Sequence, residues 1–261
     1  MKSIMKTPNS VKNFFNDEPI EFDFRPKELL EVENDSQVVN WVINKSKWPY
    51  LPLVLPEAPY IKMLSEAQNL KDLFVNHRIE DNLPVEYNNK GWASICLHGE
   101  EWNKTESFNQ YPEHKGKTEQ DIEYKWCEEI TSKCPVTTDY FKKSFPAQEY
   151  YRVRFMYLEP NGYIQPHRDR DHSMLFPVNI ALNNPEGCIF RMKDKGDVPF
   201  NPEGGACLVD ISNTHSVWNN SDTARIHIIV HFKQDSRFNN VIVNSLHAMN
   251  LGDIYKYNNT L

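Results

Sequence analysis

Hydrophobic and polar residues alternate along several short stretches in the second half of the chain, as they do in β-strands. Over residues 151–158 the apolar side chains occupy every second position, and Arg152 and Arg154 occupy positions between them. Over residues 224–232 one face is continuously apolar, and the opposite face carries Arg225 and His227. Turn-forming residues separate the strands at 161–162, 183–187, 201–205 and 219–220. This spacing predicts a β-barrel or β-sandwich.

The first half has the apolar spacing of helices and one strong strand pattern. We expect helices at about 36–43, 61–75 and 118–133, a short one capped by Thr137 or Thr138, and a core strand over 91–99. Prolines break residues 1–35 into an irregular arm and make 49–59 a connection. We predict an N-terminal arm with helices packed on the barrel (1–90), the barrel itself (91–235) and a polar tail without an assignable element (236–261), forming one compact domain.

Composition narrows the class of protein. The 261 residues carry a net charge of −7 without a basic stripe, so we expect no nucleic-acid partner. No apolar run is long enough to span a membrane, and the N-terminus is not a secretory signal. The five cysteines form no Cys-x-x-Cys pair, which favours reduced thiols and a cytoplasmic location.

Three residues together provide the ligand types of a non-haem iron site. His167 and Asp169 are two apart, so in an extended strand both point to one face, and His215 follows 46 positions after Asp169. Two imidazoles and one carboxylate leave coordination positions open, as in Fe(II) oxygenases. Asp171 and His172 are alternative ligands close by in the sequence.

Positively charged residues on the inward faces point to an anionic co-substrate. Arg225, ten residues after His215, could bind the carboxylate of 2-oxoglutarate. His227 shares its face and would either hydrogen-bond the co-substrate or substrate or be a satisfied inward histidine. Arg152 and Arg154 would bind a substrate carboxylate, assist 2-oxoglutarate or pair with inward acids.

Several strings resemble the aspartyl/asparaginyl β-hydroxylase family of oxygenases, which also includes small-molecule amino-acid hydroxylases such as the cis-proline type. The resemblance is best over 150–232 and is weaker at Gly91-Trp92 and Leu97-His98-Gly99. The strings that carry it are Pro166-His167, Gly187-Cys188, Asp210-Ile211-Ser212, His215-Ser216-Val217-Trp218 and Arg225.

The resemblance implies a double-stranded β-helix (jelly-roll, cupin-type) core, mainly β with flanking helices. It implies Fe(II) held by His167 and His215, 2-oxoglutarate held by Arg225, and O2 as co-substrate. Asp169 stands where the animal aspartyl/asparaginyl hydroxylase lacks a carboxylate ligand, and its presence argues against halogenation. We expect Trp218 to pack rather than contact substrate, and Asp210 and Ser212 to fix the turn before His215.

The leading hypothesis is therefore a 2-oxoglutarate-dependent dioxygenase that hydroxylates a C–H of an amino acid or amino-acid residue. An amino-acid-like small molecule is favoured over a peptide or protein. Two other classes stay open at this point. One is a metal-binding cupin without 2-oxoglutarate chemistry, such as an isomerase, and the other is a non-catalytic interaction module.

Overall fold

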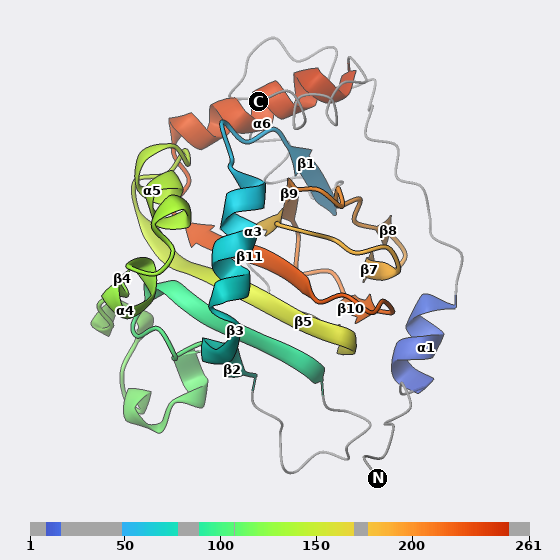
Figure 1. The fold of residues 1–261 in the computed structure, drawn as a ribbon, viewed down its shortest axis with the longest axis horizontal. Helices are drawn as coiled ribbons and strands as arrows, with labels where there is room; N and C mark the ends of the chain where they lie inside the picture. Colours follow the sequence, from blue (N-terminus) through green and yellow to red (C-terminus); the bar gives the residue numbers. More distant parts are fainter. Residues whose placement is uncertain (1–8, 17–48, 78–88, 107, 170–176, 251–261) are drawn as a thin grey trace.

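The computed structural model describes residues 9–16, 49–77, 89–106, 108–169 and 177–250, in which a curled antiparallel sheet is flanked by helices (Figure 1). The strands are β1 (Tyr50–Leu53), β2 (Val75–Asn76), β3 (Lys90–Gly99), β4 (Lys125–Trp126), β5 (Tyr150–His167), β6 (Val178–Ala181), β7 (Cys188–Met192), β8 (Gly196–Asp197), β9 (Gly205–Val209), β10 (His215–Asn219) and β11 (Arg225–Phe232). The helices are α1 (Asn9–Phe15), α3 (Tyr60–Asn69), α4 (Glu128–Thr131), α5 (Pro135–Lys143) and α6 (Ser236–Asn250).

The long strand β5 belongs to two sheets at once. Its first part, residues 150–158, pairs with β11, and the order continues through β6 and β9 to β1. Its last part, residues 163–167, pairs with β10, and the order continues through β7 to β8. The first part thus holds β1, β9, β6, β11 and β5, and the second holds β5, β10, β7 and β8. Antiparallel strands connected in this order form a jelly roll, so the predicted double-stranded β-helix core is confirmed.

The turn predicted at residues 161–162 is wrong, because β5 continues through it. Asn161 has φ +56°, and the strand changes partner from β11 to β10 across residues 159–162. A Cβ on Gly162 would lie 2.8 Å from the carbonyl oxygens of Glu159 and Lys90, so the bend requires glycine. The turn-forming residues mark the place where one strand bends from the first sheet into the second.

Alternation along β11 decides which side chains face the inside of the roll. Ile226, Ile228 and Val230 are buried in the core beneath the helices, while Arg225 and Ile229 line an internal cavity. The same alternation on β5 puts Val153 and Phe155 in the helix-side core and Arg152 and Arg154 along the cavity. These orientations agree with the period of two in the sequence.

Helices α3, α5 and α6 contribute to the core on the outer face of the larger sheet (Figure 1). Helix α6 was not predicted, although Phe238, Ile242 and Leu246 are four residues apart and all buried. Asp235 caps its start by accepting a hydrogen bond from the backbone N–H of Arg237 at 2.9 Å. In the described ranges, no helix has the length and apolarity that a membrane span requires.

Several predicted elements need correction. Residues 118–133 form a 3₁₀ turn, β4 and α4 rather than one helix, because Trp126 pairs with His98 of β3. The 49–59 connection contains β1, where Pro52 is tolerated because the strand lies at the edge of the sheet. The arm at 1–35 contains α1, which contacts β5 and β10.

Other predictions hold only in part. The helix expected at 61–75 is α3 followed by a 3₁₀ turn at Lys71–Leu73. Helix α5 begins after Cys134, not at Thr137 or Thr138. The helix expected at 36–43 lies outside the described residues.

Candidate active site

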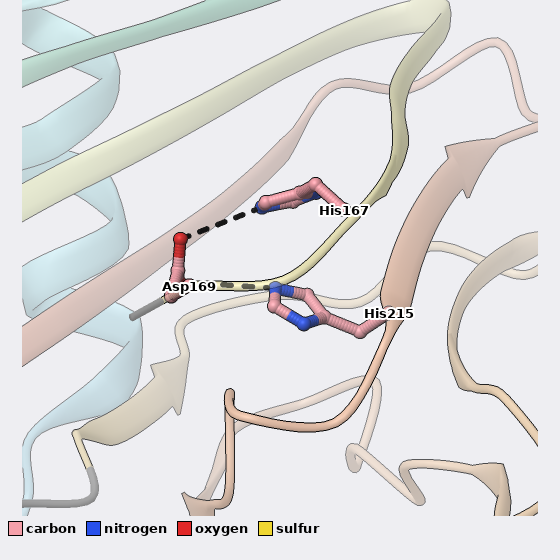
Figure 2. Close-up of side chains that lie close together, drawn as sticks. All are labelled: His167, Asp169 and His215. Carbon is pink, nitrogen blue, oxygen red and sulfur yellow. Dashed lines mark ion pairs between the residues drawn. The ribbon is translucent and has the colours of Figure 1, made fainter. Parts of the chain in front are cut away.

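His167, Asp169 and His215 come together at one position in the roll. His167 ends β5, His215 begins β10, and the two are partners in the strand register. The Nε2 atom of His167 lies 3.8 Å from Oδ1 of Asp169, and Nε2 of His215 lies 4.0 Å from Oδ2 of Asp169 (Figure 2). The three ligand atoms all lie within 4.8 Å of one another. Two imidazole nitrogens and one carboxylate oxygen are a donor set that fits Fe(II).

Hydrogen bonds to the backbone fix the orientation of both imidazoles. Nδ1 of His167 lies 2.8 Å from the carbonyl oxygen of Gln165, and Nδ1 of His215 lies 2.9 Å from that of Asn213. A carbonyl oxygen can only accept a hydrogen bond, so Nδ1 of each ring must be the N–H donor. Nε2 is then the ring nitrogen that remains for a metal. Figure 2 shows both Nε2 atoms turned toward Asp169.

The surroundings keep His215 neutral and hold it in place. Burial, followed by the repulsion of His167, lowers the pKa of His215 to about 4, so it is unprotonated near neutral pH, as a metal ligand must be. Phe190 stacks on its ring with centroids 5.4 Å apart. In the preceding turn, Oδ1 of Asp210 accepts hydrogen bonds from Oγ and backbone N–H of Ser212, so the predicted role of this pair in shaping the turn is confirmed.

Arg225 is a buried cation at the base of the cavity. It is 4 % exposed, and burial lowers its pKa to about 10, so it still carries its charge. Its Nη2 lies 2.8 Å from Nδ1 of His227, which itself lies 2.7 Å from Oδ1 of Asn179. Burial and the charge of Arg225 lower the pKa of His227, so this imidazole is neutral, and its Nδ1 either accepts from the guanidinium or donates to Oδ1 of Asn179, not both at once. Within the described ranges, Arg225 makes no ion pair with a carboxylate, and its Nε has no hydrogen-bond partner.

Two further guanidinium groups, those of Arg152 and Arg154, also line the cavity. Nη2 of Arg152 and Nη1 of Arg154 each donate to the carbonyl oxygen of Thr105 at 2.7 Å. Burial and the neighbouring Arg152 lower the pKa of Arg154 to about 10. Arg154 therefore keeps its charge beside Arg152.

One cavity of about 150 Å³ connects the metal-ligand group with all three arginines. Its lining also includes residues that the sequence did not indicate: His77, Trp92, Thr105, Glu106 and Asn179. Asn179 had a detectable signal, since it is an amide within the apolar run of β6. The other four residues lie on β3 or in the segments next to it, where the local sequence pattern does not show which side chains face the cavity.

The remaining predicted residues are also accounted for. Trp218 packs against Phe15 of α1, with ring centroids 5.7 Å apart, which confirms the packing interpretation. Asp171 and His172, the alternative ligands, lie outside the described residues.

Comparison with known families identifies the chain. The model of the aspartyl/asparaginyl beta-hydroxylase family matches residues 57–235, which is well over half of the chain. The chain belongs to this family. It is therefore a 2-oxoglutarate-dependent oxygenase that uses Fe(II), 2-oxoglutarate and O2, and a non-catalytic interaction module is excluded.

Solved structures give distant likenesses. A prolyl-4-hydroxylase from Pseudomonas putida is 11% identical with a TM-score of 0.39, over 76% of this chain and 100% of that one. A Trichoplax adhaerens prolyl hydroxylase, solved with a hypoxia inducible factor peptide fragment, is 13% identical with a TM-score of 0.41, over 82% of this chain and 96% of that one. Because these TM-scores are below 0.5, the assignment rests on the family match. No curated protein sequence matches the chain.

Proposed function

We propose that this oxygenase hydroxylates a C–H bond of an amino acid or amino-acid residue, with Fe(II) held by His167, Asp169 and His215. The observation that carries the proposal is the convergence of three ligand atoms within 4.8 Å, with Nδ1 of both imidazoles held by a backbone carbonyl and Nε2 turned toward Asp169. When bound, Fe(II) supplies with O2 the oxidant that removes hydrogen from the substrate, while 2-oxoglutarate is converted to succinate and CO2.

Arg225 holds the distal carboxylate of 2-oxoglutarate in this proposal, and His227 with Asn179 orients the guanidinium. A buried charge is costly unless an opposite charge meets it. The described residues provide Arg225 with no carboxylate in ion-pair distance, and its buried Nε has no partner among them, which supports an anionic co-substrate at this guanidinium. A guanidinium binds a carboxylate through two parallel hydrogen bonds, which also fixes the orientation of the co-substrate.

The substrate is small in this proposal. A cavity of about 150 Å³ has room for a free amino acid or for a single amino-acid side chain, so the group that is hydroxylated is small in either case. The net charge of −7 speaks against nucleic acid. All five cysteines are free thiols, which is consistent with the reducing cytoplasm as its location.

An anaerobic titration tests the proposal. Fe(II) and then 2-oxoglutarate are added to the purified protein, and the visible charge-transfer band of the chelated complex is recorded. The band should form in the natural protein, disappear in His167→Ala and persist in His247→Ala, where the lost histidine is exposed on α6. Iron binding without the band would reject the co-substrate site and favour a cupin without 2-oxoglutarate chemistry. Absence of iron binding would reject the ligand set.

A further inference from the structure

Strand β5 has a β-bulge immediately before His167. In the register between β5 and β10, His167 is opposite His215. Ile164 is opposite Val217, so residues 165–166 of β5 stand against a single residue of β10. Strict alternation from Ile164 would turn residue 167 away from the cavity, because the two are three positions apart. The extra residue reverses this, and both side chains line the cavity.

A bulge takes backbone groups out of the strand ladder, and side chains bind them here. The peptide group between Ile164 and Gln165 is held at both ends. Its carbonyl oxygen accepts a hydrogen bond from Oγ of Ser216 at 2.7 Å. Its N–H donates to Oδ1 of Asn89 at 2.8 Å. The next residue, Pro166, has no N–H to satisfy, which suits a bulge position.

The following carbonyl is the one that orients the imidazole. The carbonyl oxygen of Gln165 accepts a hydrogen bond from Nδ1 of His167 at 2.8 Å, and Nε2 of the ring is turned toward Asp169 (Figure 2). Consecutive planar peptide groups share an α-carbon, so a shift of the peptide before Gln165 moves this carbonyl. The side chains that fix the first peptide group therefore also fix the direction of His167.

The two supports reach the bulge from the strands on either side of β5. Ser216 follows His215 on β10 and is 0 % exposed. Asn89 directly precedes β3, whose first residue, Lys90, pairs with Tyr163 of β5. Because each support belongs to a neighbouring strand of the sheet, the direction of the imidazole is set by the protein itself.

We infer that Ser216 and Asn89 are positioning residues for the metal, which hold the Ile164–Gln165 peptide so that Nε2 of His167 faces the other ligands. The inference rests on the proposed function, because it concerns the support of one of the three proposed ligands. Neither side chain lines the cavity, so both act through the backbone of β5. Loss of a group that supports a metal ligand weakens metal binding by about 10- to 100-fold.

Binding of Co(II) to the metal-free full-length protein tests the inference without turnover. Co(II) binds to the same types of donor as Fe(II) and is titrated alone, in competition with a coloured chelator. Ser216→Ala and Asn89→Ala should each weaken binding by about 10- to 100-fold and change the visible spectrum of the bound ion. Asn89→Asp keeps an oxygen that accepts from the N–H of Gln165, so it should retain most of the affinity.

Ser245→Ala is the matched control. Ser245 is also 0 % exposed, and its Oγ donates to the carbonyl oxygen of Val241 at 2.6 Å within α6, on the outer face of the larger sheet. Its loss should lower the urea midpoint, as the loss of Ser216 does, and leave the affinity for Co(II) and the spectrum unchanged. If Ser216→Ala gave the same result as this control, the role of Ser216 would be structural only and the inference would be overturned.

The inference and the proposed function fail differently. If the natural protein binds Co(II) and both alanine variants bind it equally tightly, the positioning role is wrong and the iron site stands. If the natural protein binds neither Co(II) nor Fe(II), the proposed function fails, and the inference with it. Should Ser216→Ala not fold, Asn89→Ala and Asn89→Asp decide the question, because equal affinity in both would overturn the inference.

Discussion

Replacing Arg225 with methionine distinguishes a co-substrate role from a structural role, because the two roles predict opposite effects on stability. The guanidinium is 4 % exposed, its Nη2 contacts Nδ1 of His227 at 2.8 Å, and it lies 5.8 Å from the ring centroid of Phe200. Methionine fills similar space with a flexible apolar chain. The substitution therefore removes the charge with little loss of packing.

The effect on 2-oxoglutarate follows from the lost carboxylate contact. Truncating one partner of a buried, hydrogen-bonded charge pair costs about 2–5 kcal/mol. With about 3 kcal/mol, the dissociation constant of 2-oxoglutarate should rise about 150-fold. Arg225→Lys keeps the charge but loses the second parallel hydrogen bond, so its increase should be about tenfold.

In the absence of 2-oxoglutarate, the free energy of unfolding of the methionine variant should not fall. Removing a buried cation that has no carboxylate partner among the described residues should leave the free energy of unfolding unchanged or raise it by about 1 kcal/mol, whereas breaking a structural ion pair would lower it by about 3–5 kcal/mol. Urea unfolding without and with 2-oxoglutarate measures the stability of the free protein and the stabilisation that the co-substrate adds. At 100 times its dissociation constant, 2-oxoglutarate should stabilise the natural protein by about 2.7 kcal/mol and the methionine variant by about 0.3 kcal/mol. An unchanged dissociation constant, or a large loss of stability without 2-oxoglutarate, would refute the reasoning.

Three further predictions concern the metal, pH and α5. Asp169→Ala should lower iron affinity by more than the roughly 100-fold that a lost supporting group costs, as measured by competition with a chelator; unchanged affinity would contradict its role as a ligand. The metal-free protein should lose stability from pH 7 to pH 5.5, because burial holds several histidine pKa values below the unfolded value of 6.5 and only the unfolded chain takes up these protons, at up to about 1.4 kcal/mol per pH unit for each group. These histidines are His77, His98, His215 and His227. Urea midpoints should shift less with pH in His77→Gln, and a pH-independent midpoint in the natural protein would argue against buried neutral imidazoles. Glu66→Ala should cost about 2 kcal/mol in urea unfolding, because the Glu66 carboxylate accepts hydrogen bonds from the backbone N–H groups of Val136 and Thr137 and from Oγ1 of Thr137 at 2.7–2.8 Å. Asp139→Ala, which breaks only an exposed pair with Lys143, should change the free energy by less than about 0.5 kcal/mol.

Much of the fold was predictable because strand alternation is a local property. The period of two on β5 and β11 indicated that Arg152, Arg154 and Arg225 face inward, and the cavity lining agrees. The turn-forming residues near 183–187, 201–205 and 219–220 separate strands as expected. Helix α6 was also predictable, since Phe238, Ile242 and Leu246 have the spacing of one helix face.

Other elements depended on partners far along the chain. Ile122, Trp126 and Ile130 are four residues apart, as on one face of a helix. Residues 125–126 nevertheless form β4, because they pair with the end of β3. The bend at Asn161 could be read as a turn because the local signals for reversing a strand and for bending it are the same. In both cases the free energy of long-range pairing outweighed the local preference.

The sequence by itself determined the chemical types at the site: two histidines and an aspartate that suit Fe(II), and inward arginines that suit carboxylates. Only the tertiary structure decided that His215 lies beside His167, that Arg225 has no carboxylate partner among the described residues, and that Glu106 and His77 share the cavity with Arg152 and Arg154. The physical reason is that the direction of a side chain follows from its own strand, whereas its neighbours follow from strand pairing and loop closure, whose free energy is shared over the whole domain.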